Sequence, residues 1–200
     1  DSRDSARDSI RNGLKIARDC GFGLYHIDLL LERSRLHLLR GDAQAALADI
    51  EMALGDETGN GGVPADPKTG QPELLPARHP ACCYAWPVPF GLQLRAEALL
   101  LQAAQKLGTD SFAPAKLNDL PIDVTSAINE ARNLLNESLT LWQPLHDPEP
   151  EHDDQNFKLD GKEYNCKAVD THRILVDLDG GLLTPYSLKP TTVEDSGAAT

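Results

Sequence analysis

The stretch from Leu30 to Leu54, LLERSRLHLLRGDAQAALADIEMAL, predicts two helices joined by a tight turn. Apolar residues recur at helical spacing on both sides of Gly41 and Asp42, as on helices with a buried face. Glycine commonly follows the last residue of a helix, and aspartate commonly caps the start of one. We therefore expect one helix over 24–40 and a second over 43–54, packed against each other.

A pattern of small and large apolar residues in the second of these helices occurs three times in the chain. The three copies are Ala6-Ile10-Gly13-Leu14, Ala46-Ile50-Ala53-Leu54 and Ala131-Leu135-Ser138-Leu139, and the first two lie forty positions apart. Residues at this spacing share one helix face, and small side chains there allow a neighbouring helix to approach closely. Self-similarity of this kind predicts stacked helical pairs.

Length, charge and cysteine content argue against nucleic-acid binding, a membrane span and disulfides. The 200 residues fit a single domain or one segment of a repeat array, and their net charge of −12 argues against a nucleic-acid backbone as partner. No apolar run is long enough to cross a membrane. The four cysteines, Cys20, Cys82, Cys83 and Cys166, have no regular spacing, which is typical of reduced thiols in the cytoplasm.

The rest of the chain divides into helices, insertions and a tail. Further helices are expected over 4–20, 89–107, 124–142 and 161–178. Two insertions rich in proline and glycine occupy 55–87 and 108–122, and an acidic linker occupies 146–160. We expect one helical domain over 1–183 and a disordered tail over 184–200.

The stretch Leu30–Leu54 resembles a tetratricopeptide repeat. The matching positions are Ser34 in the first helix, Gly41 at the turn, and Ala46, Ile50 and Ala53 in the second helix. Leu30 and His37 stand where the family has tryptophan and tyrosine, so the repeat is divergent. The resemblance implies an all-α, TPR-like α-solenoid of about three helical pairs, with a groove lined by the first helix of each pair. The whole chain also resembles the carboxy-terminal repeat region of bacterial STAND- and NACHT-type signalling proteins.

This resemblance implies a scaffold for protein–protein interaction, without enzymatic activity or a cofactor. The partner would be another protein or another domain of the same parent chain. The chain begins with Asp1 rather than Met, inside what reads as a second helix, so we expect a part of a larger protein. The alternative function is a ligand-sensing regulatory domain of a bacterial signalling or defence NTPase or protease. In that case the nucleotide site lies elsewhere, because Gly161-Lys162 lacks the other residues of a phosphate loop.

Two polar stripes on the helix over 24–40 supply candidate binding residues. Asp28, Glu32 and Arg35 stand near the positions with which the repeat family lines its groove, so they are the first candidates for partner contact. The second stripe consists of His26, Arg33, His37 and Arg40. It is either a basic strip for an acidic partner or a helix edge paired with carboxylates such as Asp49 or Glu97.

A third hypothesis is a small metal-binding helical domain. His79, Cys82 and Cys83 could supply two or three ligands of a zinc site, with Cys166 or His172 as further candidates. The alternative is that these side chains pack and anchor the loop, and the sequence favours that reading because a full set of ligands at regular spacing is missing.

Overall fold

The computed structural model describes residues 2–82, 85–143, 156–159, 162–165 and 168–183. The helices are α1 (Ser2–Cys20), α2 (Gly23–Leu39), α3 (Ala43–Leu54), α4 (Pro87–Leu107), α5 (Ile122–Trp142) and α6 (Ala168–Asp179), with a short 3-10 helix, η1 (Pro114–Asp119), between α4 and α5. The strands are β1 (Asn156–Leu159) and β2 (Lys162–Asn165). The chain is therefore mainly α-helical, as the sequence predicts.

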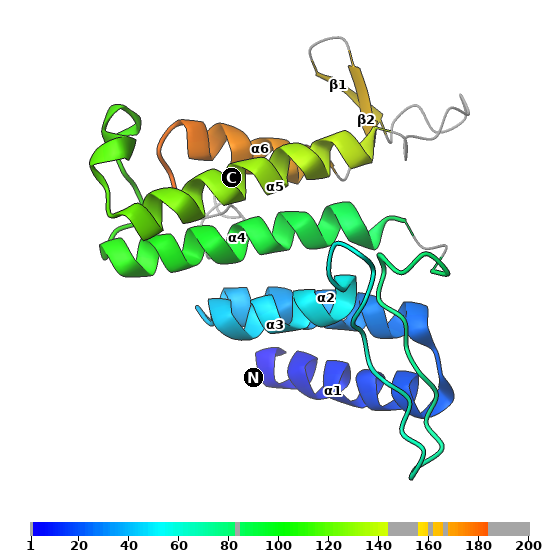
Figure 1. Ribbon diagram of the computed structural model, residues 1–200. Coiled ribbons are helices and arrows are strands. Elements are labelled where there is room, and N and C mark those ends of the chain that lie inside the picture. Colours follow the sequence, from blue (N-terminus) through cyan, green and yellow to red (C-terminus); the bar gives the residue numbers. More distant parts are fainter. Residues whose placement is uncertain (1, 83–84, 144–155, 160–161, 166–167, 184–200) are drawn as a thin grey trace, which may run out of the picture.

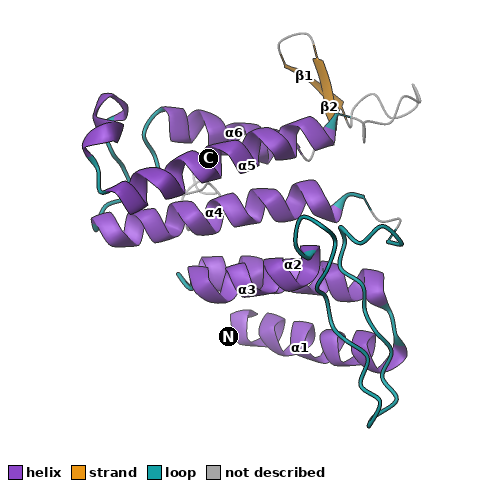
Figure 2. Cartoon of the chain, viewed as in Figure 1, coloured by secondary structure: helices purple, strands orange, loops and turns teal. Residues whose placement is uncertain are grey.

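Successive helices pack against each other along the chain, and α2 also contacts α4. Figure 1 shows the resulting order from one end of the molecule to the other: α1, then α2 and α3, then α4, then α5 and α6. The cartoon in Figure 2 shows that long loops connect α3 to α4 and α4 to α5. These loops are the two predicted insertions, although α4 and α5 each begin two residues earlier than the sequence suggested.

The turn between α2 and α3 is built as the sequence predicts. Gly41 has a φ of 78°, which glycine adopts without strain. Its amide donates to the Leu38 carbonyl and the Asp42 amide donates to the His37 carbonyl, each at 2.9 Å, which closes the end of α2. The Asp42 carboxylate then accepts the Ala45 amide at 3.0 Å and caps α3. This local chemistry fixes the path between the two helices.

The recurring small-residue pattern lies in the core at its two later copies. The residues Ala46, Ile50, Ala53, Leu54, Ala131, Leu135, Ser138 and Leu139 are all buried. Gly91 of α4 shows how closely the helices approach, since a β-carbon there would lie 2.7 Å from a methyl group of Leu54. Ala46 and Ala53 of α3 and Ala131 of α5 thus lie in the hydrophobic clusters where these helices pack on their neighbours.

Two hydrophobic clusters share helix α4. Leu94 and Ala98 belong to a cluster with α1, α2 and α3, whereas Ala96 and Leu100 belong to a cluster with α5 and α6. Phe90, near the start of α4, packs against both clusters. Helix α4 is therefore buried on two sides, like a helix between two layers.

Over residues 55–82, the insertion between α3 and α4 forms a loop with two limbs, which runs past α2 and α3 to α1 in Figure 1. An isolated antiparallel bridge joins Val63 to Leu74 across the limbs. The Arg18 guanidinium of α1 donates to the carbonyls of Pro64 at 2.6 Å and Pro72 at 3.1 Å, and to the Gln71 side chain at 3.1 Å. One arginine of α1 thus ties both limbs to the helical layer.

The prediction of a helix from Gly161 to Leu178 is wrong over its first part. Residues 162–165 form β2, which pairs antiparallel with β1 so that Asn156 faces Asn165 and Leu159 faces Lys162. The sequence between the strands is Asp160-Gly161, a dipeptide that favours two-residue hairpin loops. Helix α6 begins only at Ala168. The predicted acidic linker also ends early, at β1, while 144–155 and the predicted tail over 184–200 lie outside the described residues.

Candidate functional site

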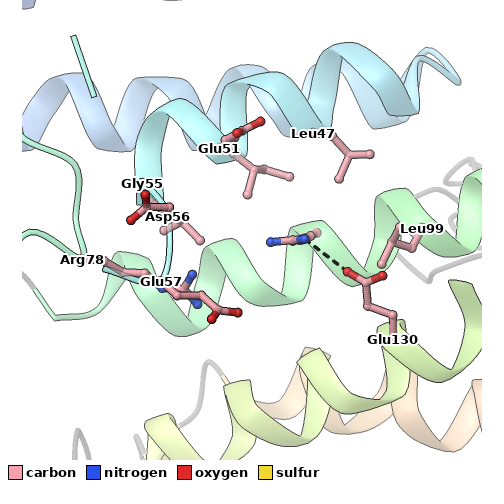
Figure 3. Close-up of a pocket in the computed structure, with 11 residues that line it drawn as sticks. Leu47, Glu51, Gly55, Asp56, Glu57, Arg78, Leu99 and Glu130 are labelled. Carbon is pink, nitrogen blue, oxygen red and sulfur yellow. Dashed lines mark hydrogen bonds and ion pairs between the residues drawn. The ribbon is translucent and has the colours of Figure 1, made fainter. Parts of the chain in front are cut away.

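A groove opens between helices α3, α4 and α5. It consists of two adjoining hollows of about 440 Å³ each, which share the side chains of Glu57, Arg78, Arg95 and Glu130. This size lies within the range of roughly 300–1,000 Å³ that is usual for ligand sites. Figure 3 shows the groove between α3 and α4, with Glu130 of α5 at its edge.

The floor of the groove is apolar. Ile50 and Leu54 of α3 are buried beneath it. Leu47, Leu99 and Leu134, from α3, α4 and α5 respectively, are half-buried and line it. Because these leucines are only partly covered by the fold, a ligand in the groove would remove further apolar surface from water.

The rim of the groove is charged. Arg95 of α4 and Glu130 of α5 form an ion pair at 3.2 Å. Arg78 of the insertion and Glu137 of α5 approach to 3.6 Å, with the Arg78 side chain 17% exposed. Each pair links elements that are distant in sequence, so charges of both signs meet at the rim of the groove.

The insertion supplies part of this rim because it returns to the end of α3. The amides of Ala77 and Arg78 donate to the carbonyls of Ala53 and Leu54, at 2.8 and 3.1 Å. These bonds satisfy carbonyls that the end of a helix otherwise leaves without a donor. They also place the Arg78 side chain beside the groove.

Asp56 and Glu57, at the start of the insertion just after α3, also line the groove. One oxygen of the Asp56 carboxylate accepts the Thr58 hydroxyl at 2.6 Å and the amides of Thr58 and Asn60 at 2.8 and 2.9 Å. These donors, the Thr58 hydroxyl first, lower the pKa of Asp56 below its usual value. The carboxylate at this position therefore stays ionised while it shapes the turn.

The predicted basic stripe on α2 turns largely toward α3. Arg33 donates two hydrogen bonds to the Asp49 carboxylate, at 2.7 and 2.6 Å, and His37 Nε2 lies 3.6 Å from the same group. His26 is buried, and burial lowers its pKa. Arg33 and His37 therefore belong to a helix edge that is paired with a carboxylate, Asp49, which is the second of the two interpretations of the stripe. The other carboxylate of that interpretation, Glu97, is fully buried in α4.

Asp28, Glu32 and Arg35, the first candidates for partner contact, lie outside the groove. Glu32 and Arg35 form an exposed pair at 3.2 Å on α2, and the Arg35 guanidinium lies 5.9 Å from the ring centre of Phe90. Neither these side chains nor Asp28 line the two hollows. A groove lined by first helices was expected, whereas these hollows lie over α4 between α3 and α5.

The candidate metal ligands serve a local turn. His79 Nδ1 accepts the Ala81 amide at 3.1 Å, and the Cys82 amide donates to the His79 carbonyl at 2.8 Å. Among the described residues, no group of three His, Cys, Asp or Glu side chains could hold a metal ion. His172 lies on α6, while Cys83 and Cys166 lie outside the described residues.

The groove residues carry a signal that sequence reasoning missed. Three helices each place a leucine four positions from a charged residue: Leu47 with Glu51, Arg95 with Leu99, and Glu130 with Leu134. Residues at this spacing lie side by side on a helix. Each pair alone is commonplace, and only the packing of the three helices brings the pairs to one surface.

Comparison of the chain with known protein families, with curated proteins and with solved structures gives no match. Throughout the described residues, every helix is too short or too polar to cross a membrane.

Proposed function

We propose that this chain is a protein-recognition module on a helical-repeat scaffold, and that it acts within a larger protein or assembly. The observation that carries the proposal is the groove between α3, α4 and α5, with half-buried leucines on its floor and fixed charges on its rim. Protein-binding surfaces commonly combine an apolar centre with a polar rim. The resemblance to tetratricopeptide repeats supports the same function.

The charged side chains of the groove fit the recognition of a partner. Its titratable side chains are carboxylates and arginines. Both arginines are already engaged with glutamates, at 3.2 and 3.6 Å. Charges on the rim of an interface steer and orient a partner of complementary charge, which gives specificity.

Photo-crosslinking tests this proposal. A photoreactive amino acid placed at Asn133, an exposed residue that lines the groove, is expected to capture a discrete partner in cells that make the protein. Asn118 of η1, which is exposed outside the groove, is the matched control position.

The captured protein is then purified, and its direct binding is measured with and without the substitution Leu47→Gln. Capture at Glu32 of α2 instead would move the recognition surface to that helix, and capture at neither position would contradict the proposal.

A further inference from the structure

The lining of the groove has more carboxylates than cations. The acidic side chains are Glu51, Asp56, Glu57, Glu130 and Glu137, and the basic ones are Arg78 and Arg95. Each arginine pairs with one glutamate of α5. The other three carboxylates have no ion pair with any residue that the structure describes, and all three belong to the end of α3 and the residues that follow it.

These three carboxylates are accessible to a ligand. Glu51, Asp56 and Glu57 are all exposed. Within the described part of the chain, the carboxylates of Glu51 and Glu57 have neither an ion pair nor a hydrogen bond. This end of the groove is thus suited to a cation.

The groove has a charged end and an apolar end. Figure 3 shows Asp56, Glu57 and Arg78 together where α3 gives way to the insertion, while Leu47 and Leu99 lie farther along the two helices. A ligand that fits both ends needs a positive group beside an apolar one. Peptide segments with lysine or arginine next to leucine-like side chains have this chemistry.

We propose that the occupant of the groove is a basic, partly apolar segment of a partner protein, with its lysine or arginine on Glu51 and Glu57 and its apolar side chains on Leu47 and Leu99. This inference rests on the proposed function, because it names the partner of the same site. The net charge of −12 on each copy also disfavours a second copy of the chain as the occupant, because the two copies repel each other.

Selection from a peptide library displayed on phage tests the inference. The full chain is the bait, and the selected peptides are expected to carry lysine or arginine beside leucine, isoleucine or phenylalanine. One selected peptide is then labelled with fluorescein for titration. The double variant Glu51→Gln/Glu57→Gln is expected to weaken its binding about three- to tenfold, since an exposed ion pair contributes less than about 1 kcal/mol. The weakening should shrink as salt is added.

The matched control is Glu73→Gln/Asp119→Asn, which removes the same charge at exposed sites outside the groove. It should leave the affinity unchanged. Equal weakening by both double variants would overturn the inference, because only the net charge of the chain would then matter.

Hydrogen exchange of the peptide complex separates this inference from the proposed function. Protection of residues 47–57 and 130–137 by peptides without lysine or arginine would refute the basic partner and leave a recognition groove. Failure of every selected peptide to protect these residues would refute both. Protection by basic peptides, together with the loss in the groove variant, would support both.

Discussion

Arg33 and Asp49 join α2 to α3 through two hydrogen bonds to a carboxylate that is only 8% exposed. The substitution Arg33→Ala removes the donors and leaves Asp49 buried without them. We expect a loss of about 1–3 kcal/mol in the free energy of unfolding, measured by chemical denaturation. Arg11→Ala breaks an exposed pair with Asp8 and is the control, with an expected change within about 0.5 kcal/mol. Similar values for the two variants would show that Asp49 is well solvated.

His26 makes stability depend on pH. Burial lowers the pKa of His26 below its ordinary value of 6.5, and the charges of Arg18 and Arg33 act in the same direction. As the pH falls through 6.5, the unfolded chain takes up a proton that the folded chain resists. The fold therefore loses stability on acidification. Between about pH 7.5 and pH 5.5, His26→Gln should lose less unfolding free energy than the wild type. Identical slopes in the two proteins would contradict this role of His26.

At the scale of elements, the insertion depends on Arg18 of α1. Its guanidinium is the donor to Pro64, Gln71 and Pro72 of the two limbs. The substitution Arg18→Ala should speed hydrogen exchange at the amides of Val63 and Leu74, which bridge the limbs, by about tenfold or more, because it removes several hydrogen bonds at once. Arg11→Ala, on the same helix, is the control. Unchanged exchange in the Arg18 variant would mean that the bridge holds the limbs without the helix.

The elements that sequence could predict are those whose signals are local. The turn at Gly41 and Asp42 was predicted because both residues act on neighbouring backbone groups. The hairpin of β1 and β2 was missed although Asp160-Gly161 is a local signal. The helical spacing of apolar residues begins only at Ala168, whereas the predicted helix began at residue 161. The groove was missed for a different reason. It needs the insertion to return to Leu54, and that return depends on contacts between residues distant in sequence.

At the scale of the whole molecule, helix α4 couples the two hydrophobic clusters. Neither cluster is complete without it, because α4 supplies two buried side chains to the cluster of α1–α3 and three to the cluster of α5 and α6. The groove lies over α4 as well, between α3 of one cluster and α5 of the other. The shape of the groove therefore depends on both clusters being folded at the same time.

This coupling predicts cooperative unfolding. Leu94 belongs to the cluster of α1–α4, while both tryptophans contact the other cluster, Trp142 as a member and Trp86 packed against it. Leu94→Ala should cost about 2–5 kcal/mol, because it leaves a cavity in the core. If α4 joins the clusters into one unit, tryptophan fluorescence and far-ultraviolet circular dichroism should shift to the same lower denaturant midpoint. Leu39→Ala, at a side chain that is 46% exposed, should shift neither. A fluorescence midpoint that stays in place while helicity is lost earlier would show that the clusters unfold separately.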